Sequence, residues 1–258
     1  MRRGAHIAAA FALIAGATPA GAERLVSSLS AHHVLITPSF TGTELVLFGV
    51  VEADRASPPR RGGYEIVATV TGPRETIVVR RKEQVLGIWV NADSRTFVQV
   101  PSYLAVLSTK PVEEIASLDV LRRLQIGLRR TLLPQQIGPD TADVVREDPF
   151  RTSFLRLKQS RELYVEEPDA VTFITSTMYR ANIPVPAAVP VGNYEVDLKL
   201  FADGALIARG GEAFEIRKFG FEQFLASSAV NHGALYGFAT AGLALLTGWI
   251  ASVLFRRD

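Results

Sequence analysis

The strongest constraint on this chain is an uncharged, mostly apolar run near its C-terminal end. Residues 233–255 read GALYGFATAGLALLTGWIASVLF, and Arg256, Arg257 and Asp258 follow them. An α-helix rises about 1.5 Å per residue, so about 20 apolar residues cross a hydrocarbon layer roughly 30 Å thick. The run therefore predicts one transmembrane helix over 233–255. A buried core helix is the alternative, but such a helix usually shows a polar stripe, and here small polar groups are only scattered.

The N-terminal segment has the pattern of a secretory signal. Arg2 and Arg3 are basic, residues 7–17 form an apolar stretch that is short for a span, and residues 20–22 are small. This order of charge, apolar stretch and cleavage site is typical of a signal peptide. We expect residues 1–22 to be removed, with an uncleaved N-terminal anchor as the alternative.

Together the two apolar segments predict a topology. The signal exports the N-terminal part, while Arg256 and Arg257 stay in the cytoplasm because positive charge is retained on that side. We expect a single-pass type I protein of the inner (plasma) membrane. Its N-terminal ectodomain lies in the periplasm, 256–258 form a cytoplasmic tail, and there is no cytoplasmic catalytic domain.

The charge and the cysteine content of the chain exclude several classes of function. The formal charge of +2 falls to zero without Arg2 and Arg3, and the tail 256–258 holds +1, so the exported part carries about −1. That charge gives no electrostatic footprint for nucleic acid. The chain has no cysteine, which excludes thiol chemistry, disulfides and thiolate metal sites. No P-loop or dinucleotide fingerprint occurs, and we expect no cofactor and no metal.

Most of the exported part alternates apolar and polar residues in the way of half-buried strands. Such segments fill 23–110, where three short strands are expected over 76–80, 85–90 and 95–100, and they return over 168–218. In the second part Asp203-Gly204 is a hairpin turn signal, because both residues tolerate positive φ, and Gly210-Gly211 indicates a bulge or bend. These patterns predict a mainly β, immunoglobulin-like antiparallel β-sandwich of one or two domains.

Residues 111–167 change to a helical period and predict an inserted α-helical pair. Pro111 with acidic residues behind it begins a helix of about four turns. Asp148 and Pro149 have the pattern of an N-cap followed by proline at the first helical position. The expected order is thus ectodomain strands, helical insertion, ectodomain strands, a juxtamembrane segment over 219–232 and the C-terminal transmembrane helix.

Three blocks carry a resemblance to a known family. They are VTFITSTMYRANIPVPAAVPVGNYEVDLKLFADGALI over 171–207, KFGFEQFL over 218–225 and LYGFATAGLALLTGW over 235–249. They resemble a family of predicted single-pass transmembrane proteins from alphaproteobacteria, with a signal peptide and a C-terminal span. The resemblance implies membrane anchorage and a membrane partner such as an exporter-like protein. The family has no assigned chemistry, so no functional residue is transferred.

Candidate catalytic residues are few. His32 and His33 are adjacent, so on a strand they point to opposite faces and do not easily ligate one ion. A surface or structural role is expected for both. The pairs Glu113-Glu114 and 166–167 are explained as charged helix ends. A periplasmic hydrolase that uses His32 or His33 with a carboxylate remains the rival hypothesis.

The membrane-proximal residues offer the other candidates. Aromatic side chains favour the interface between lipid and water, and the expected interface anchors are Phe219, Phe221, Phe224, Tyr236 and Trp249. The segment 219–232 lies on the membrane as a short helix or is an ordinary linker packed on the ectodomain.

Small residues spaced four apart form a candidate helix-packing face at Gly233, Gly237 and Ala241, because such residues let a second helix approach closely in lipid. We therefore expect a non-enzymatic accessory, assembly or binding module of an inner-membrane complex, in contact with the lipid bilayer. Its partner is a second copy or a membrane protein such as a transporter. The alternative to the hydrolase is a small-ligand receptor, which requires a concave apolar pocket with convergent polar groups.

Overall fold

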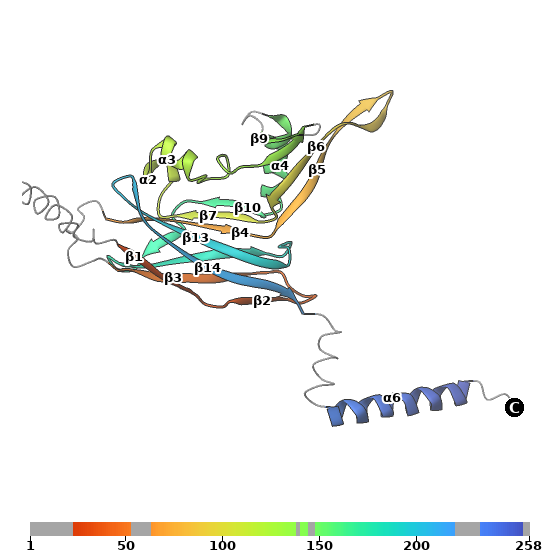
Figure 1. The fold of residues 1–258 in the computed structure, drawn as a ribbon. Helices are drawn as coiled ribbons and strands as arrows, with labels where there is room; N and C mark the ends of the chain where they lie inside the picture. The colour runs from red at the N-terminus through yellow and green to blue at the C-terminus, as the bar shows by residue number, and fades with distance from the viewer. Residues whose placement is uncertain (1–22, 53–62, 138–139, 144–147, 220–232, 255–258) are drawn as a thin grey trace, which may run out of the picture.

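The computed structural model describes residues 23–52, 63–137, 140–143, 148–219 and 233–254, and it is mainly β (Figure 1). Three sheets carry the strands. The first sheet is antiparallel throughout and has the order β1 (Arg24–Leu29), β3 (Gly42–Glu52), β12 (Met178–Pro186), β11 (Val171–Phe173).

The second sheet has six strands and pairs in both senses. Its order is β10 (Tyr164–Glu167), β7 (Leu104–Ser108), β4 (Glu65–Thr71), β13 (Gly192–Ala202), β14 (Ala205–Lys218), β2 (His33–Ile36). The two edge pairs, β10 with β7 and β14 with β2, are parallel, and the inner pairs are antiparallel. Strand β1 of the first sheet lies against β14 of the second, and β12 lies against β7, so the two sheets enclose a common core.

Strand β13 shows why this core forms. Tyr194, Val196 and Leu198 are buried, whereas Glu195 and Asp197 between them are exposed. Successive side chains of a strand point to opposite faces, so the alternation in the sequence turns the apolar set toward the other sheet. This strand was predicted from its period, and the prediction is confirmed.

The turn after β13 is also as predicted. Asp203 and Gly204 have φ of 50° and 78°, which is the two-residue turn that suits the twist of a hairpin. The expected bulge at Gly210-Gly211 is wrong, since the register shift lies between Leu200 and Phe201. Glycine is needed at 210 for a different reason: a Cβ there would come within 3.1 Å of the Leu25 Cβ, where β1 packs on β14.

The third sheet is built on one long hairpin. Its order is β5 (Arg74–Val85), β6 (Ile88–Pro101), β8 (Pro134–Ile137), β9 (Asp140–Asp143). The three short strands expected over 76–100 are therefore two long ones, joined by a tight turn at Leu86 and Gly87. In Figure 1 this hairpin projects well beyond the other two sheets.

The insertion 111–167 differs from the expected helical pair. The first helix is replaced by two short ones, α2 (Val112–Ile115) and α3 (Leu118–Arg123), because Ala116 and Ser117 are extended and interrupt the helix. Helix α4 (Pro149–Gln159) begins as predicted: the Asp148 carboxylate accepts a hydrogen bond from the Arg151 backbone N–H at 3.1 Å. Strands β8, β9 and β10 also lie in the described insertion, together with the loop that follows α3.

Helix α6 (Gly233–Leu254) covers the C-terminal apolar run. Within the part of the chain that the structure describes, no helix meets the length and hydropathy of a membrane span. The signal peptide 1–22 and most of the juxtamembrane segment, 220–232, lie outside the described residues.

Candidate functional site

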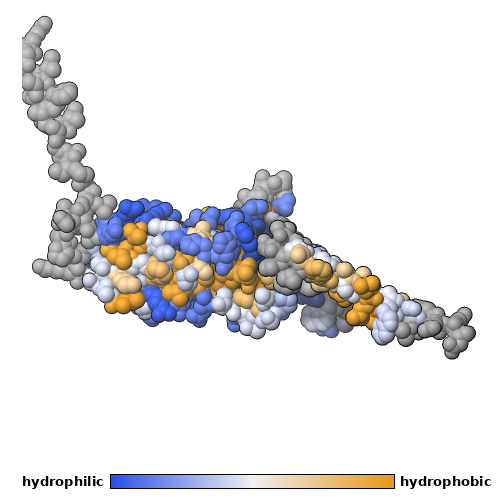
Figure 2. Space-filling model, turned by 90° about the horizontal axis from the view of Figure 1, so that it is seen from below, coloured by the Kyte–Doolittle hydropathy of each residue, from blue (hydrophilic) through white to orange (hydrophobic). Residues whose placement is uncertain are grey.

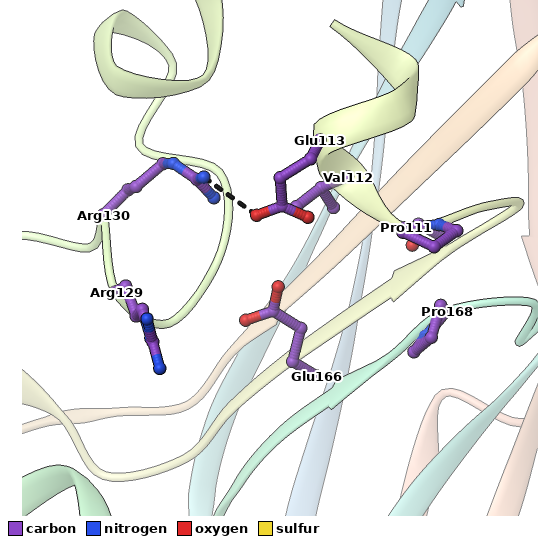
Figure 3. Close-up of a pocket in the computed structure, with 8 residues that line it drawn as sticks. Pro111, Val112, Glu113, Arg129, Arg130, Glu166 and Pro168 are labelled. Carbon is purple, nitrogen blue, oxygen red and sulfur yellow. Dashed lines mark hydrogen bonds and ion pairs between the residues drawn. The ribbon is translucent and has the colours of Figure 1, made fainter. Parts of the chain in front are cut away.

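A hollow of about 370 Å³ lies where the short helices meet the edge of the second sheet (Figure 3). Helix α2 contributes Glu113, the loop after α3 contributes Arg129 and Arg130, and strand β10 contributes Glu166. The remaining lining residues are Ser108, Pro111, Val112 and Pro168. The hollow thus brings two carboxylates and two guanidinium groups together from segments far apart in the sequence.

One ion pair crosses this hollow. The Arg130 Nη2 donates to the Glu113 Oε1 at 2.8 Å, and Figure 3 shows the two side chains reaching toward each other. The hydrogen bond from Arg130 is the main cause that holds the pKa of Glu113 below its usual range. The Glu113 side chain is more than half exposed, so solvent screens the pair and it contributes little to stability.

Glu166 has a different partner, the backbone of the loop opposite. Its Oε2 accepts a hydrogen bond from the Leu128 N–H at 2.9 Å. The loop turns at Gly127, whose φ is 96°, and a Cβ there would lie 3.0 Å from the Arg130 Nη1 and 3.4 Å from the Glu166 Oε1. Glycine is favoured at this turn by its positive φ, since the two side-chain ends near it are flexible.

Hydrogen bonds within the hollow engage several of its polar groups. Two carboxylates that face one cleft are the arrangement of a glycosidase, but its general acid needs a raised pKa, and that of Glu113 is lowered. The Ser108 hydroxyl donates to the Lys110 carbonyl at 2.6 Å and is thereby turned to the backbone. Among the described residues the Arg129 guanidinium makes no hydrogen bond or ion pair, which leaves it able to bind a ligand carboxylate or phosphate.

A second polar centre lies under helix α4, around the buried amine of Lys158. Its Nζ donates to the Glu75 Oε1 at 2.6 Å and to the Ser102 carbonyl at 3.0 Å. The faces of Phe154 and Tyr164 lie 5.8 Å and 5.6 Å from the same nitrogen. These contacts satisfy the amine and tie α4 to β5, so Lys158 has a structural role beside a hollow of about 440 Å³.

The comparison with known protein families covers nearly the whole chain. A family described as Putative transmembrane protein (Alph_Pro_TM) matches residues 24–257. The chain belongs to this family. A comparison with the curated proteins finds no match. The resemblance seen in the sequence is confirmed, and the family match runs from strand β1 through the charged hollow to helix α6.

Helix α6 carries the predicted packing face and two of the predicted interface anchors. The packing face of Gly233, Gly237 and Ala241 is exposed, and a Cβ added at either glycine would meet nothing within 4 Å. Trp249 is exposed, and Tyr236 is partly buried. The structure therefore keeps this face open for a partner without showing one.

The aromatic anchors before α6 are described only in part. Phe219 lies at the end of the β2–β14 ladder, where its N–H donates to the Ile36 carbonyl at 2.9 Å. Phe221 and Phe224 lie outside the described residues. The choice between a membrane-lying helix and a linker over 219–232 stays a prediction.

The two histidines lie on the surface at the edge of the second sheet. His33 is paired in register with Glu215 of β14, and the His32 carbonyl accepts a hydrogen bond from the Glu215 N–H at 2.8 Å. Both side chains are exposed. Within the described residues there is also no group of three acidic or histidine side chains that could hold a metal ion.

Sequence reasoning missed the meeting of Glu113 and Glu166. Glu113 was correctly placed in the first turn of a helix. Glu166 was assigned to a helix end but belongs to strand β10, which pairs with β7. Residues 164–167 are buried, partly buried, exposed and exposed in turn, so the segment lacks the period-two alternation that indicates a strand.

Proposed function

We propose that this protein is a membrane-anchored, exported binding module that serves as an accessory or assembly component of an inner-membrane complex. The observation that carries the proposal is helix α6, which has no polar stripe and whose described side chains are exposed except for the partly buried Tyr236. Its large exposed apolar side chains are Phe238, Leu243, Leu245, Leu246, Trp249 and Ile250.

An apolar surface of this kind is expected to be buried against protein or lipid. Leaving apolar area in water costs about 25 cal/mol per Å², and a helix without a polar stripe is normally enclosed by protein or by lipid. In Figure 2 this helix is the elongated, mainly orange segment next to the C-terminal grey atoms. The uncharged run continues to Phe255 in the sequence, and the family's name supports lipid as the cover.

The strand order supports an immunoglobulin-like ectodomain. The first sheet, β1-β3-β12-β11, matches the A-B-E-D order of that fold, and β4, β13 and β14 of the second sheet match C, F and G. The Tyr194 hydroxyl donates to the Pro190 carbonyl at 2.5 Å, four residues upstream, which is the tyrosine corner of such domains. Domains of this architecture commonly present loops and edges to partners, which agrees with a binding role.

The anchor is tested by extraction of membranes with alkaline carbonate. Full-length protein should stay with the membrane pellet, because α6 is held in the hydrocarbon layer. A Leu243→Lys, Leu246→Lys double variant should move largely to the supernatant, since each central lysine costs about 3 kcal/mol in a span. The matched control is Leu118→Lys, Leu132→Lys, which changes two exposed leucines of the ectodomain and should remain in the pellet. Release of the wild type into the supernatant would contradict the proposal.

The accessory role is tested by crosslinking in native membranes followed by mass spectrometry. Gly237→Leu should reduce recovery of the crosslinked membrane partner, because leucine blocks close approach on the Gly233, Gly237, Ala241 face. Gly242→Leu lies off that face and should leave recovery unchanged. If the protein is recovered only as a monomer, and Gly237→Leu changes nothing, helix pairing is wrong.

A further inference from the structure

The outer half of the β5–β6 hairpin stands apart from the rest of the fold. Strand β8 pairs with β6 only at Thr96 and Phe97, and farther out β5 and β6 pair only with each other in the described structure. The described side chains over 81–92 are exposed. A two-stranded ribbon is only marginally stable in water, so this half of the hairpin gains from a surface to lie against.

The tip of this hairpin is apolar. Leu86 and Gly87 form the turn with φ of 51° and 83°, and Ile88 and Trp89 follow at once. Leu86 is 99% exposed, Ile88 68% and Trp89 66%. Three large apolar side chains are thus exposed at the outer end of the hairpin.

Basic residues lie farther back on the hairpin, on strand β5, with Glu83 between them and the tip. Arg80, Arg81 and Lys82 succeed one another on β5, and opposite them on β6 lie Ser94, Asp93 and Asn91. Arg81 contacts Glu83 at 2.9 Å, while Arg80 and Lys82 make no ion pair within the described residues. An apolar tip followed by positive charge is the chemistry of a segment that enters the surface of an anionic bilayer, where each basic residue near the headgroups contributes about 1 kcal/mol.

The hairpin also leaves the ectodomain at the end from which the chain continues to α6. Gly192 pairs with Ile216 near the end of β14, and a Cβ at Gly192 would lie 3.0 Å from the Pro73 Cγ at the base of β5. Figure 1 shows the hairpin base and the end of β14 at the same end of the sandwich. An extended residue spans up to about 3.5 Å, so the 13 residues 220–232 reach roughly 45 Å. That length lets α6 and the hairpin tip meet one membrane surface.

We propose that the tip of the β5–β6 hairpin is a second membrane contact, with Leu86, Ile88 and Trp89 in the lipid interface and Arg80 and Lys82 on anionic headgroups. This inference rests on the proposed membrane anchorage. A protein partner fits the tip less well, because three side chains offer far less than the roughly 800 Å² that each partner of a stable complex buries. A second contact would hold the ectodomain at a set angle to the membrane.

The test uses Trp89 as its own reporter. The chain has two tryptophans, so Trp249→Phe leaves Trp89 as the single one. This full-length variant is reconstituted into phosphatidylcholine vesicles, with and without phosphatidylglycerol, and into the same vesicles with brominated acyl chains. Trp89 emission should shift to the blue and be quenched by brominated lipid, with at least twofold stronger quenching when phosphatidylglycerol is present.

Variants in the same background define the surface. Leu86→Asp with Ile88→Asp should abolish the quenching, and Arg80→Gln with Lys82→Gln should remove its dependence on phosphatidylglycerol. The control is Leu118→Asp, an exposed leucine of α3, which should change neither. Thermal unfolding of each variant shows that the ectodomain is intact, since all these side chains lie outside the core.

The possible outcomes distinguish the proposed hairpin contact from the membrane anchorage on which it rests. If the protein floats with the vesicles but Trp89 is not quenched, the hairpin contact is wrong and the anchorage stands. If the protein does not float, both are wrong. A blue shift without bromine quenching that disappears at low protein-to-lipid ratio means that the tip binds another protein copy, and it overturns the lipid contact.

Discussion

Gly49 lies at the tightest approach in the first sheet. It is in the middle of β3, between β1 and β12, and a Cβ built on it would come within 2.3 Å of the Val26 carbonyl oxygen and 2.5 Å of the Tyr179 hydroxyl. Neither atom can move easily, because one is backbone of a paired strand and the other belongs to a fully buried ring. The sequence alone offers no reason to single out this glycine.

Gly49→Ala should therefore destabilise the ectodomain strongly. Overpacking typically costs about 1–3 kcal/mol, and a clash with backbone belongs at the upper end of that range. The measurement is the midpoint of urea unfolding followed by circular dichroism.

Gly211→Ala is the matched control for Gly49. It also lies within a strand, but a Cβ there would meet only the Val196 carbonyl at 3.4 Å, which is near ordinary contact. Its unfolding midpoint should change by less than a third of the Gly49→Ala change. Equal effects of the two substitutions would mean that strand propensity, rather than the contact, sets the cost.

Among the elements, helix α4 begins with a capping residue that also makes a hydrogen bond to a distant strand. Asp148 caps the helix through its Oδ2, as its sequence context predicted. The same oxygen accepts a hydrogen bond from the Nε2 of the fully buried Gln135 at 2.8 Å. The capping signal was readable from Asp148 and Pro149, whereas the bond to β8 depends on a fold that brings the two segments together.

Asp148→Ala should lower the free energy of unfolding by more than the loss of an ordinary helix cap does. Loss of a cap costs about 1 kcal/mol, and the buried Gln135 amide would in addition lose an acceptor worth about 1–3 kcal/mol. We expect a loss of about 2–4 kcal/mol in the free energy of unfolding. Asp148→Asn should retain most of the stability, because one amide oxygen can accept both hydrogen bonds. If Asp148→Asn is as damaging as Asp148→Ala, the carboxylate charge matters and the bonding scheme above is wrong.

In the short helices α2 and α3 the structure departs from what the local sequence pattern predicted. Of the residues whose helical period predicted one apolar face, Ile115, Leu121 and Leu128 are buried, whereas Leu124 is partly buried and Leu118 is exposed. They are not on one helix, because Ala116 and Gln125 leave the helical conformation and let each segment turn its apolar side to the core separately. The helical period therefore identified most of the buried side chains here, but it did not reveal the break between the two helices.

Over the whole molecule, buried tyrosines hold the layers together. Tyr103 and Tyr194 both lie between the sheets with their rings 5.8 Å apart, and their hydroxyls donate to the carbonyls of Pro184 and Pro190. The Tyr164 hydroxyl donates to the Pro101 carbonyl at 2.7 Å. Burial raises the pKa of these three side chains well above the ordinary value near 10, and it raises the pKa of Tyr179 to about 12.

These shifts predict a steep loss of stability in alkali. Because the folded pKa lies above the unfolded one, the contribution is fully present below pH 10 and is lost as pH rises toward the folded values. At pH 11 each of the four tyrosines costs roughly 1 kcal/mol, since the unfolded chain ionises and the folded chain does not. The phenolate absorbance of these four tyrosines should appear together with unfolding between pH 10 and 12.

A variant isolates this effect. Tyr179→Phe removes one titrating group, so its stability relative to wild type should improve as pH rises from 9 to 11.5. A difference between the two proteins that does not change with pH would contradict the shift at Tyr179.

The local patterns of the sequence were sufficient to predict the mainly β class, the Asp203-Gly204 turn, the cap of α4 and the apolar C-terminal helix, because each depends on residues close together in the chain. The resemblance to the family could also be seen in the sequence. Only the tertiary structure decided that Glu113 and Glu166 share a hollow, that Lys158 is buried against β5, and that the β5–β6 hairpin leaves beside the end of β14. These facts join residues tens of positions apart, and no local period encodes which distant strands become neighbours.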